Sequence, residues 1–513
     1  MHIECSKLNG EFHLRVVQSY SVTEEGKVKN KKMVVKNIGP LSDFDDGQPN
    51  YLERLRESFK RGEPLIPSLA EMANGKSIAY EVPLSQAISN APAYTVVQNL
   101  GWFLIDSIYE ALGISSVVYE SKLKTELDIQ GILKKLVIDR ILRHGNLIDS
   151  FMNQNLELFP VVKIGSAEDI LKALEYISEM SDAIVMRMNG RINKSFKRSG
   201  ILYGDVIDAE IELDTSRDED KTRFVYEKQI AILVDEFGIP FDFDILSGCY
   251  SPPVFSETAL SKTKGKDCVI VPCGRLNNAE NLEEWQDKGY GYIVSKNLRA
   301  KDIKKWLADS EGYVYNKERT FKAKWKLLDS GERVIGYWDK EYEKIKSSSP
   351  NNTGKKTDEL DSKILGCRTL VSHKAIKPAV EIVEIYNSKV IDKASKRAKM
   401  IFSLISDKPD ETEIKATCLI SHIALVIIRI MQLRVENHGG IDIKADEFPI
   451  ASVRNSLLSI RAVKFYANMY RLSETLGDAK LLMDSFGIDL NLAFPTAADL
   501  RKLKTKFKDI GLA

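Results

Sequence analysis

The stretch Ile201-Leu202-Tyr203-Gly204-Asp205-Val206-Ile207-Asp208-Ala209-Glu210-Ile211-Glu212-Leu213 sets carboxylates within an apolar run. From Ala209 onward, apolar and acidic residues alternate with period two, which predicts a strand with one buried face. A carboxylate on a central strand is costly to bury unless it is paired or binds a metal. Asp205 is therefore a candidate functional residue; the alternative is a strand-end carboxylate that faces solvent.

Further strands are predicted on the C-terminal side of this stretch. Apolar runs at 229–235 and 239–245 follow it across short turns, which indicates an antiparallel meander. A strand at 269–275, an amphipathic helix at 277–288 and a strand at 291–296 come next. Three antiparallel strands followed by strand–helix–strand is the order of an RNase H-like sheet, so we expect a mixed α/β fold.

Four segments of this region resemble, in order and spacing, the core of bacterial insertion-sequence transposases of the DDE type. They are L-Y-G-D-V (202–206), I-L-V-D-E-F-G-I-P-F-D-F-D-I-L-S-G (232–248), V-I-V-P-C-G-R-L-N-N-A-E-N-L (269–282) and K-G-Y-G-Y-I-V-S-K-N-L-R (288–299). The resemblance also touches the N-terminus and the C-terminal third. It implies a five-stranded RNase H-like sheet with flanking helices, an inserted β-containing segment, and an N-terminal β-hairpin followed by a helical domain.

The resemblance implies a catalytic site of three carboxylates that hold two Mg²⁺ or Mn²⁺ ions for DNA cleavage and strand transfer. Asp205 matches the first acid and Asp392 the third, and these two are the expected metal ligands. The second position falls on Cys273, or on Pro272 in the alternative register. Because neither residue is a carboxylate, a nearby acid would have to replace it, with Asp267 and Glu280 as the first candidates.

The third motif of the family corresponds here to a basic helix around Asp392. Tyr386, Lys389 and Lys399 match positions of that motif, and Lys396 lies on the same helix. The resemblance implies that Lys389 and Lys399 contact the phosphates of transposon ends, and we expect Tyr386 and Lys396 to bind DNA beside them. His422 also matches a family position, although a single His on an apolar helix is more often a core residue. Asp235, Asp242 and Asp244 are further possible ligands, and we interpret Asp235 as a turn residue.

Cations cluster at three further places. Arg187, Arg191, Lys194, Lys197 and Arg198 precede the Asp205 strand without an intervening acid. Lys322 and Lys324 lie on the first strand of a predicted hairpin at 319–338, and further lysines lie in the turn and second strand of an N-terminal hairpin at 12–39. A charge run is usually a solvated face; the alternative here is contact with the DNA backbone.

Composition is that of an ordinary globular protein, and it neither requires nor excludes DNA binding. The 513 residues include 74 basic and 73 acidic side chains, so positive charge must be clustered to bind DNA. The first residues contain no apolar signal-peptide core, and the apolar run at 418–430 is interrupted by polar residues, as in a buried helix. The six cysteines lack zinc-ligand spacing. We expect a cytoplasmic protein without a membrane segment.

The expected domains are listed by residue: 1–50, an N-terminal β-hairpin region; 51–198, a helical, DNA-binding region; 199–300 with 364–440, the RNase H-like core; 301–363, a β-containing insertion and linker; and 441–513, a helical tail. Two functions remain open. One is a DDE transposase that binds inverted-repeat ends and target DNA, as a homodimer in the DNA complex. The other is a degenerate or repurposed descendant that binds double-stranded DNA without cutting it. A nuclease of the same fold is a third, weaker possibility.

Overall fold

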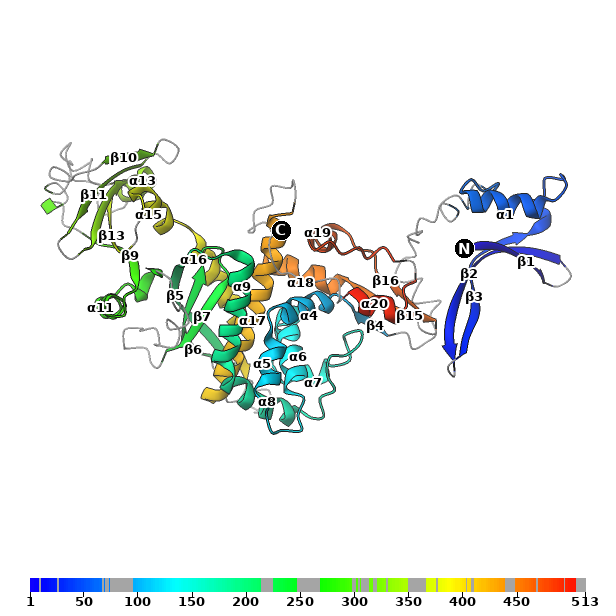
Figure 1. The fold of residues 1–513 in the computed structure, drawn as a ribbon, viewed down its shortest axis with the longest axis horizontal. Helices are drawn as coiled ribbons and strands as arrows, with labels where there is room; N and C mark the ends of the chain where they lie inside the picture. The colour runs from blue at the N-terminus through cyan, green and yellow to red at the C-terminus, as the bar shows by residue number, and fades with distance from the viewer. Residues whose placement is uncertain are drawn as a thin grey trace. The chain divides into compact units, whose positions relative to one another are not determined.

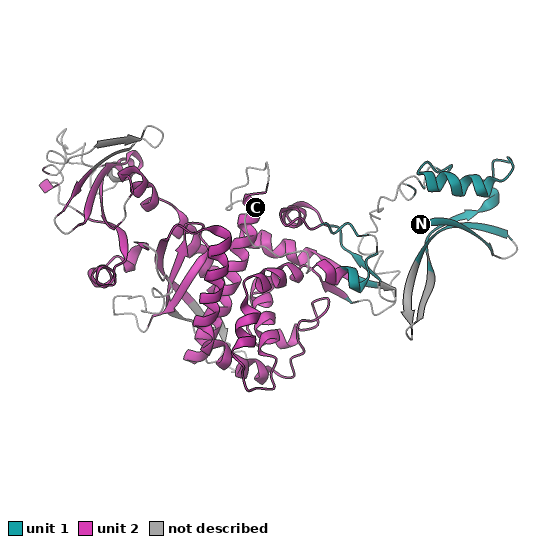
Figure 2. Ribbon diagram, viewed as in Figure 1, with its two compact units in different colours: residues 1–96, 463–474, 489–499 teal, residues 97–462, 475–488, 500–513 magenta. Residues whose placement is uncertain are grey.

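The structure is a computed structural model, and it describes residues 1–8, 11–24, 27–66, 69, 73, 96–213, 225–246, 268–297, 301–302, 305, 313–316, 321–328, 331–348, 366–374, 377–402, 404–406, 410–438, 448–466, 469–492 and 494–503. The chain divides into two compact units, drawn in different colours in Figure 2. The first comprises residues 1–96, 463–474 and 489–499, and the second comprises the rest.

A three-stranded antiparallel sheet forms the centre of the first unit. Its strands are β1 (His2–Leu8), β2 (Glu11–Glu24) and β3 (Lys27–Pro40), followed by the short helix η1 (Leu41–Asp43). The β2–β3 hairpin confirms the alternating pattern seen in the sequence. Helix α1 (Tyr51–Arg61) packs Leu55 and Phe59 against Ile3 and Leu14 of the sheet. It ends at Gly62, whose φ of 90° is a conformation that glycine adopts without strain.

A large sheet organises the second unit. Strands β5 (Ile201–Leu213), β6 (Val225–Asp235) and β7 (Pro240–Ile245) form an antiparallel meander. Strand β8 (Val269–Pro272) pairs in parallel with β5, and β9 (Gly291–Ser295) pairs in parallel with β8. Helices η3 (Gly274–Leu276) and α11 (Ala279–Asp287) connect the last two strands. The order β7-β6-β5-β8-β9 therefore sets β5 between the meander and the parallel pair.

The sheet is larger than the five strands expected, which corrects that expectation. Strand β13 (Cys367–His373) pairs antiparallel with β9, and β12 (Arg333–Trp338), β11 (Phe321–Leu327) and β10 (Tyr313–Asn316) follow in turn. With β14 (Leu404–Ser406) beside β5, the sheet has ten strands. The β11–β12 hairpin was expected, but its strands extend the sheet because β12 pairs with β13, whose other edge pairs with β9. An edge strand such as β13 offers unpaired backbone N–H and C=O groups to a further strand.

The two faces of the sheet have separate apolar cores. Ile201 and Tyr203 of β5 face a cluster that includes Ile382 of α15 (Ala379–Tyr386) and Ala394 of α16 (Val390–Phe402). Leu202 and Val206 face the other cluster, in which Trp285 of α11 is fully buried. Because side chains alternate along a strand, Asp205 lies on the same face as Ile201 and Tyr203.

The predicted helical region between residues 96 and 198 is observed, with shorter elements than expected. After strand β4 (Val97–Asn99), the helices are α4 (Trp102–Ala111), α5 (Ile114–Glu120), α6 (Ile129–Leu142), α7 (Asp149–Met152), α8 (Ala167–Glu179) and α9 (Ser181–Phe196). Local signals fix several ends: the Asp128 side chain caps α6, and Ser166 with Asp169 forms a capping box on α8.

Helix α17 (Glu411–Glu436) is the long apolar helix expected to be buried. By length and composition it is the one helix in the described part of the chain that could cross a membrane, but 89% of its most apolar window is buried inside the protein. It contacts β7 and α16 as well as α6 and α8. Figure 1 shows it running between the strands β5–β7 and the helices α4–α8. Its apolar surface is therefore explained by protein packing on all sides.

The remaining elements are α13 (Lys340–Ser347), α18 (Ile450–Ser459), β15 (Arg461–Tyr466), β16 (Met469–Leu472), α19 (Gly477–Ser485) and α20 (Ala497–Lys502). The single helix expected over 379–404 is divided into α15 and α16. Most of the linker expected at 347–358 lies outside the described residues.

Candidate active site and nucleic-acid interface

Asp205 lies on β5 and points toward α16. Its Oδ2 atom accepts a hydrogen bond of 2.6 Å from Ser395 Oγ, and its Oδ1 atom accepts one of 2.9 Å from the backbone N–H of Val206. Ser395 is 7% exposed, so the contact is sheltered from water. Both carboxylate oxygens of this half-buried residue therefore already have protein donors.

Cys273 lies beside Asp205, at the end of β8. Gly204 pairs with Pro272 in the β5–β8 register, and the backbone N–H of Cys273 donates to Gly204 O at 2.8 Å. A Cβ atom placed on Gly274 would lie 3.7 Å from Asp205 Oδ1. Cys273 and Asp205 each come one residue after the paired residues Pro272 and Gly204, so Cys273 is the neighbour of Asp205. Pro272 is buried in the strand.

Asp392 lies in the first turn of α16 and is exposed. Ser395 follows three residues later, is buried and contacts Asp205, so Asp392 lies where the side of α16 that faces β5 meets its exposed side. The pKa of the Cys273 thiol is raised, first by burial and then by the negative charges of Asp205 and Asp392. Both carboxylates are therefore close enough to act on one thiol, and the structure brings these three residues together.

These residues do not fit the two-ion site that the family resemblance implies. Two hard divalent ions require several carboxylate oxygens, but this site offers two carboxylates and a thiol that stays protonated at neutral pH. Within the part of the chain that the structure describes, no group of three or more His, Cys, Asp or Glu side chains is arranged to hold a metal ion. The donor set as it stands does not support two-metal chemistry.

The other acids considered from the sequence do not complete the set. Asp267 lies outside the described residues, and Glu280 is exposed on the first turn of α11. Asp235 is a structural turn residue, as expected: Oδ1 accepts from the N–H groups of Phe237 and Ile239, and Oδ2 accepts from Arg198 Nε at 2.5 Å. Asp242 and Asp244 each accept a bond from the next backbone N–H in β7.

The cations of α9 and of the two residues that follow it are divided between surface and core. Arg191, Lys194 and Lys197 are exposed, and Arg187 pairs with Glu120 at 2.7 Å. Arg198 was expected at the DNA surface but is buried. Its guanidinium forms an ion pair with Asp235 and lies over the ring of Phe241. The difference arises because the chain leaves the helix at Lys197 in a left-handed conformation, and the next residue turns inward toward β6.

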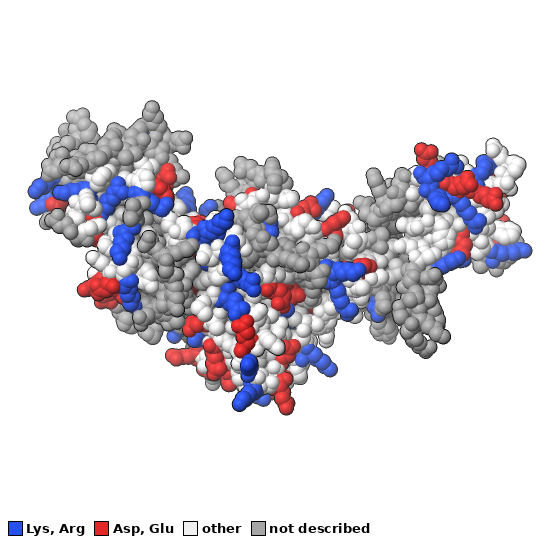
Figure 3. Space-filling model, viewed as in Figure 1, with Lys and Arg blue, Asp and Glu red and all other residues white. Residues whose placement is uncertain are grey.

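Helix α16 carries a continuous basic surface. Lys389, just before the helix, and Lys396 and Lys399 are exposed, as expected, and Lys393 joins them. The spacing of three to four residues sets these side chains on one side of the helix. Asp392 is the one acidic residue of α16, and it lies within this basic surface. Figure 3 shows Lys and Arg side chains in the region where Figure 1 draws α9 and α16.

Other residues singled out in the sequence have structural surroundings. Tyr386 is half-buried against the apolar cluster under α15, with the Arg368 guanidinium 5.7 Å from its ring centroid. His422 is 2% exposed and its ring lies 5.3 Å from that of Phe243, as in a core residue. The side chains of Lys322 and Lys324 lie outside the described part of the structure.

Sequence reasoning missed Ser395, which donates to the candidate catalytic carboxylate. Its position one turn after Asp392 was a usable signal, because residues three apart on a helix share a side. Without knowledge of which helix side faces β5, a Ser in the sequence K-A-S-K-R did not stand out.

Comparisons with known proteins assign no family. No protein-family model matches the chain, and no curated protein matches it. Among solved structures, the chain is similar to a piggyBac transposase in a cryo-EM structure of its synaptic complex with hairpin DNA. The identity is 10%, the match covers 80% of this chain and 84% of that chain, and the TM-score is 0.33. At that TM-score the likeness carries no argument about fold or function, so function has to be argued from the chain's own residues.

Proposed function

We propose that this protein binds double-stranded DNA through α16 and α9, and that it descends from DDE-type transposases but no longer cuts DNA efficiently. The observation that carries the proposal is the basic surface of α16, which surrounds Asp392 and adjoins Asp205 and Cys273.

The strand order supports an RNase H-like core. The meander β5–β6–β7 followed by the parallel strands β8 and β9 is the order expected from the sequence resemblance. The first matched acid lies on the central strand β5, the second matched position follows β8, and the third lies on a helix packed over β5. Three positions far apart in the sequence thus meet at one place, which is what a shared ancestral site requires.

The basic surface suits a phosphate backbone. Lys389, Lys393, Lys396 and Lys399 are exposed at helical spacing, and cations in such a row can each approach a phosphate. The near-zero net charge of the whole chain makes this local concentration meaningful, because the protein has no general excess of positive charge to attract DNA.

Loss of efficient cutting follows from the donor set. A protonated thiol between two carboxylates does not supply the charge that neutralises a second divalent ion. One observation favours the alternative of an active transposase: both flanking carboxylates are present and act on the same thiol. That alternative requires a third acid from elsewhere.

Charge reversal on α16 tests the binding proposal. We expect Lys396→Glu with Lys399→Glu to weaken binding of a duplex. The plot of log affinity against log salt should also become less steep by about 2, since each lost phosphate contact reduces the steepness of the slope by about one. Fluorescence anisotropy over a range of salt concentrations measures both.

Lys172→Glu, an exposed charge reversal on α8, is the matched control and should leave binding nearly unchanged. Thermal unfolding of each variant checks that the fold is kept. An unaltered protein that fails to bind duplex DNA at low salt, or binds it independently of salt, would refute the proposal.

A further inference from the structure

A polar cavity lies at the C-terminal end of α6, away from the residues singled out in the sequence as DNA contacts or metal ligands. Its volume is ≈ 180 Å³, and it is lined by Arg140, Arg143, Asn146, Asp149, Ser150 and Asn153 among others. This volume is far above the space that one water needs. The cavity is therefore large enough for a small polar ligand.

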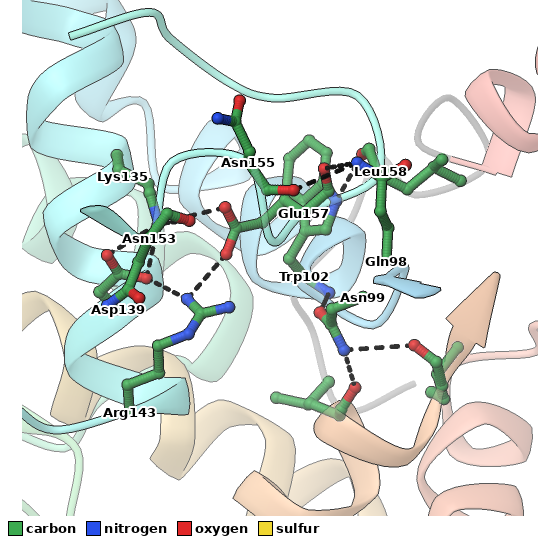
Figure 4. Close-up of polar contacts among 12 residues, drawn as sticks. Gln98, Asn99, Trp102, Lys135, Asp139, Arg143, Asn153, Asn155, Glu157 and Leu158 are labelled. Carbon is green, nitrogen blue, oxygen red and sulfur yellow. Dashed lines mark hydrogen bonds and ion pairs between the residues drawn. The ribbon is translucent and has the colours of Figure 1, made fainter. Parts of the chain in front are cut away.

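Two residues that line the cavity, Asp139 and Arg143, belong to a buried network of ion pairs, shown in Figure 4. Lys135 Nζ lies 2.8 Å from Asp139 Oδ2 and 3.1 Å from Glu157 Oε2. Arg143 Nη1 lies 2.7 Å from Glu157 Oε1 and also contacts Asp139. Two carboxylates are matched by two cations, so Asp139 and Glu157 present no excess negative charge to the cavity.

Arg140 adds a further positive charge beside this neutral network. Its side chain lines the cavity, the residue is 3% exposed, and burial lowers its pKa to about 10, which leaves it charged at neutral pH. The neighbouring His144 is also affected by this positive charge. Burial, and then the charges of Arg140 and Arg454, lower its pKa to about 4, so it is neutral at pH 7. This end of α6 is therefore electropositive within the protein interior.

Ser150 supplies a hydrogen-bonding group at the cavity. The residue is 1% exposed, and its Oγ atom has no hydrogen-bond partner among the described residues. Buried hydroxyl groups normally have a partner, so this hydroxyl is left to form a hydrogen bond with a molecule in the cavity. Asp149, the neighbouring residue, is exposed and adds a negative charge to the lining.

We propose that this cavity binds a small oxyanion of the phosphate class. Arg140 and the hydroxyl of Ser150 hold the oxyanion, and the negative charge of Asp149 weakens its binding. A guanidinium group matches the geometry of a phosphate through parallel N–H donors. The tetrahedral oxygens leave acceptors for the hydroxyl. The phosphate could be free in solution or belong to nucleic acid, and the experiment separates these sources.

Calorimetric titration of the full chain with inorganic phosphate, at constant ionic strength set with NaCl, tests the proposal. We expect binding to the unaltered protein and about two- to tenfold weaker binding to Ser150→Ala, the loss of one hydrogen bond. Asp149→Asn should bind more tightly, because the opposing charge is gone. Arg140→Met should bind no phosphate, provided that it folds.

Lys396→Ala with Lys399→Ala is the control for binding on α16 and should leave phosphate affinity unchanged. Displacement of phosphate by duplex DNA would identify nucleic acid as the source of the oxyanion, and no displacement would identify free phosphate. The proposal would be overturned if titration with phosphate gave no more heat than titration with chloride. Equal phosphate affinity in the unaltered protein, Ser150→Ala and Asp149→Asn would overturn it as well. Since Ser150→Ala and Asp149→Asn leave α16 unchanged, that outcome would not affect the DNA-binding proposal.

Discussion

Cys273 decides the chemistry available between Asp205 and Asp392. Its thiol is half-buried, and its pKa is raised first by burial and then by the two carboxylates. A thiol in this setting does not become a thiolate near neutral pH, so it brings no negative charge. A carboxylate in the same place would bring the charge that the site lacks, at the cost of repulsion from two neighbours.

We expect Cys273→Asp to raise Mg²⁺-dependent cleavage of duplex DNA above that of the unaltered protein, because it adds the third carboxylate. Gel electrophoresis of plasmid and linear duplex substrates, with and without Mg²⁺, measures the change. Adding Asp205→Asn to the same variant should remove the gain.

Cys367→Asp, at another half-buried cysteine of the sheet, is the matched control and should produce no gain. If the unaltered protein cuts well and Cys273→Ala cuts equally well, our interpretation of this position is wrong.

At the scale of elements, tertiary contacts set helix boundaries that local sequence does not mark. The break between α15 and α16 falls at Asn387, whose Oδ1 atom accepts bonds from Tyr337 of β12 and Arg368 of β13, both at 3.2 Å. The position of the break between α15 and α16 therefore depends on β12 and β13, two strands beyond the five expected from the sequence. Helix α4 likewise begins where Gly101 approaches the backbone of α18: a Cβ atom there would lie 2.1 Å from Leu457 O.

We expect Gly101→Ala to lower the free energy of unfolding by about 1–3 kcal/mol or more, because backbone atoms cannot move aside as a flexible side chain can. Gly190→Ala is the matched control. Gly190 is inside α9, and a Cβ atom there would meet nothing within 4 Å. That change should raise stability by about 0.5–1 kcal/mol.

Chemical denaturation of both variants measures the two effects. Equal effects of the two changes would contradict the close contact between α4 and α18.

At the scale of the whole molecule, the two units have separate cores. Leu55 belongs to the core of the first unit, under the β1–β3 sheet. Leu419 of α17 is fully buried in the second unit, where this helix contacts both the sheet and the helices α6 and α8. Since α17 contacts both layers, we expect the second unit to unfold cooperatively and separately from the first.

Leu55→Ala and Leu419→Ala test this independence, because each removes a fully buried side chain at a cost of about 2–5 kcal/mol. We expect the first change to raise hydrogen exchange in residues 1–66 alone. The second should raise it across α6, α8 and α17 and in β5–β7. Each variant serves as the control for the other, and an increase across both units in either variant would refute separate cores.

The sequence by itself determined much of the element pattern. Period-two alternation and short turns predicted β2–β3, β5–β7 and β11–β12, because these strands each bury one or both faces in a regular way. The apolar run of α17 predicted a buried helix. The acids Asp205 and Asp392 and the lysines of α16 were also identified from the sequence, through a resemblance in motif order. Their roles in cleavage and DNA binding remain predictions.

Only the tertiary structure decided which of these residues meet. That Cys273, rather than Pro272, adjoins Asp205 depends on the β5–β8 register, and that Ser395 contacts Asp205 depends on how α16 packs on β5. Arg198 was expected at the surface with its neighbours, but it is buried against Asp235, a partner 37 residues away. Charge and periodicity are local properties of a sequence, whereas partners across strands are set by pairing and packing over long distances along the chain.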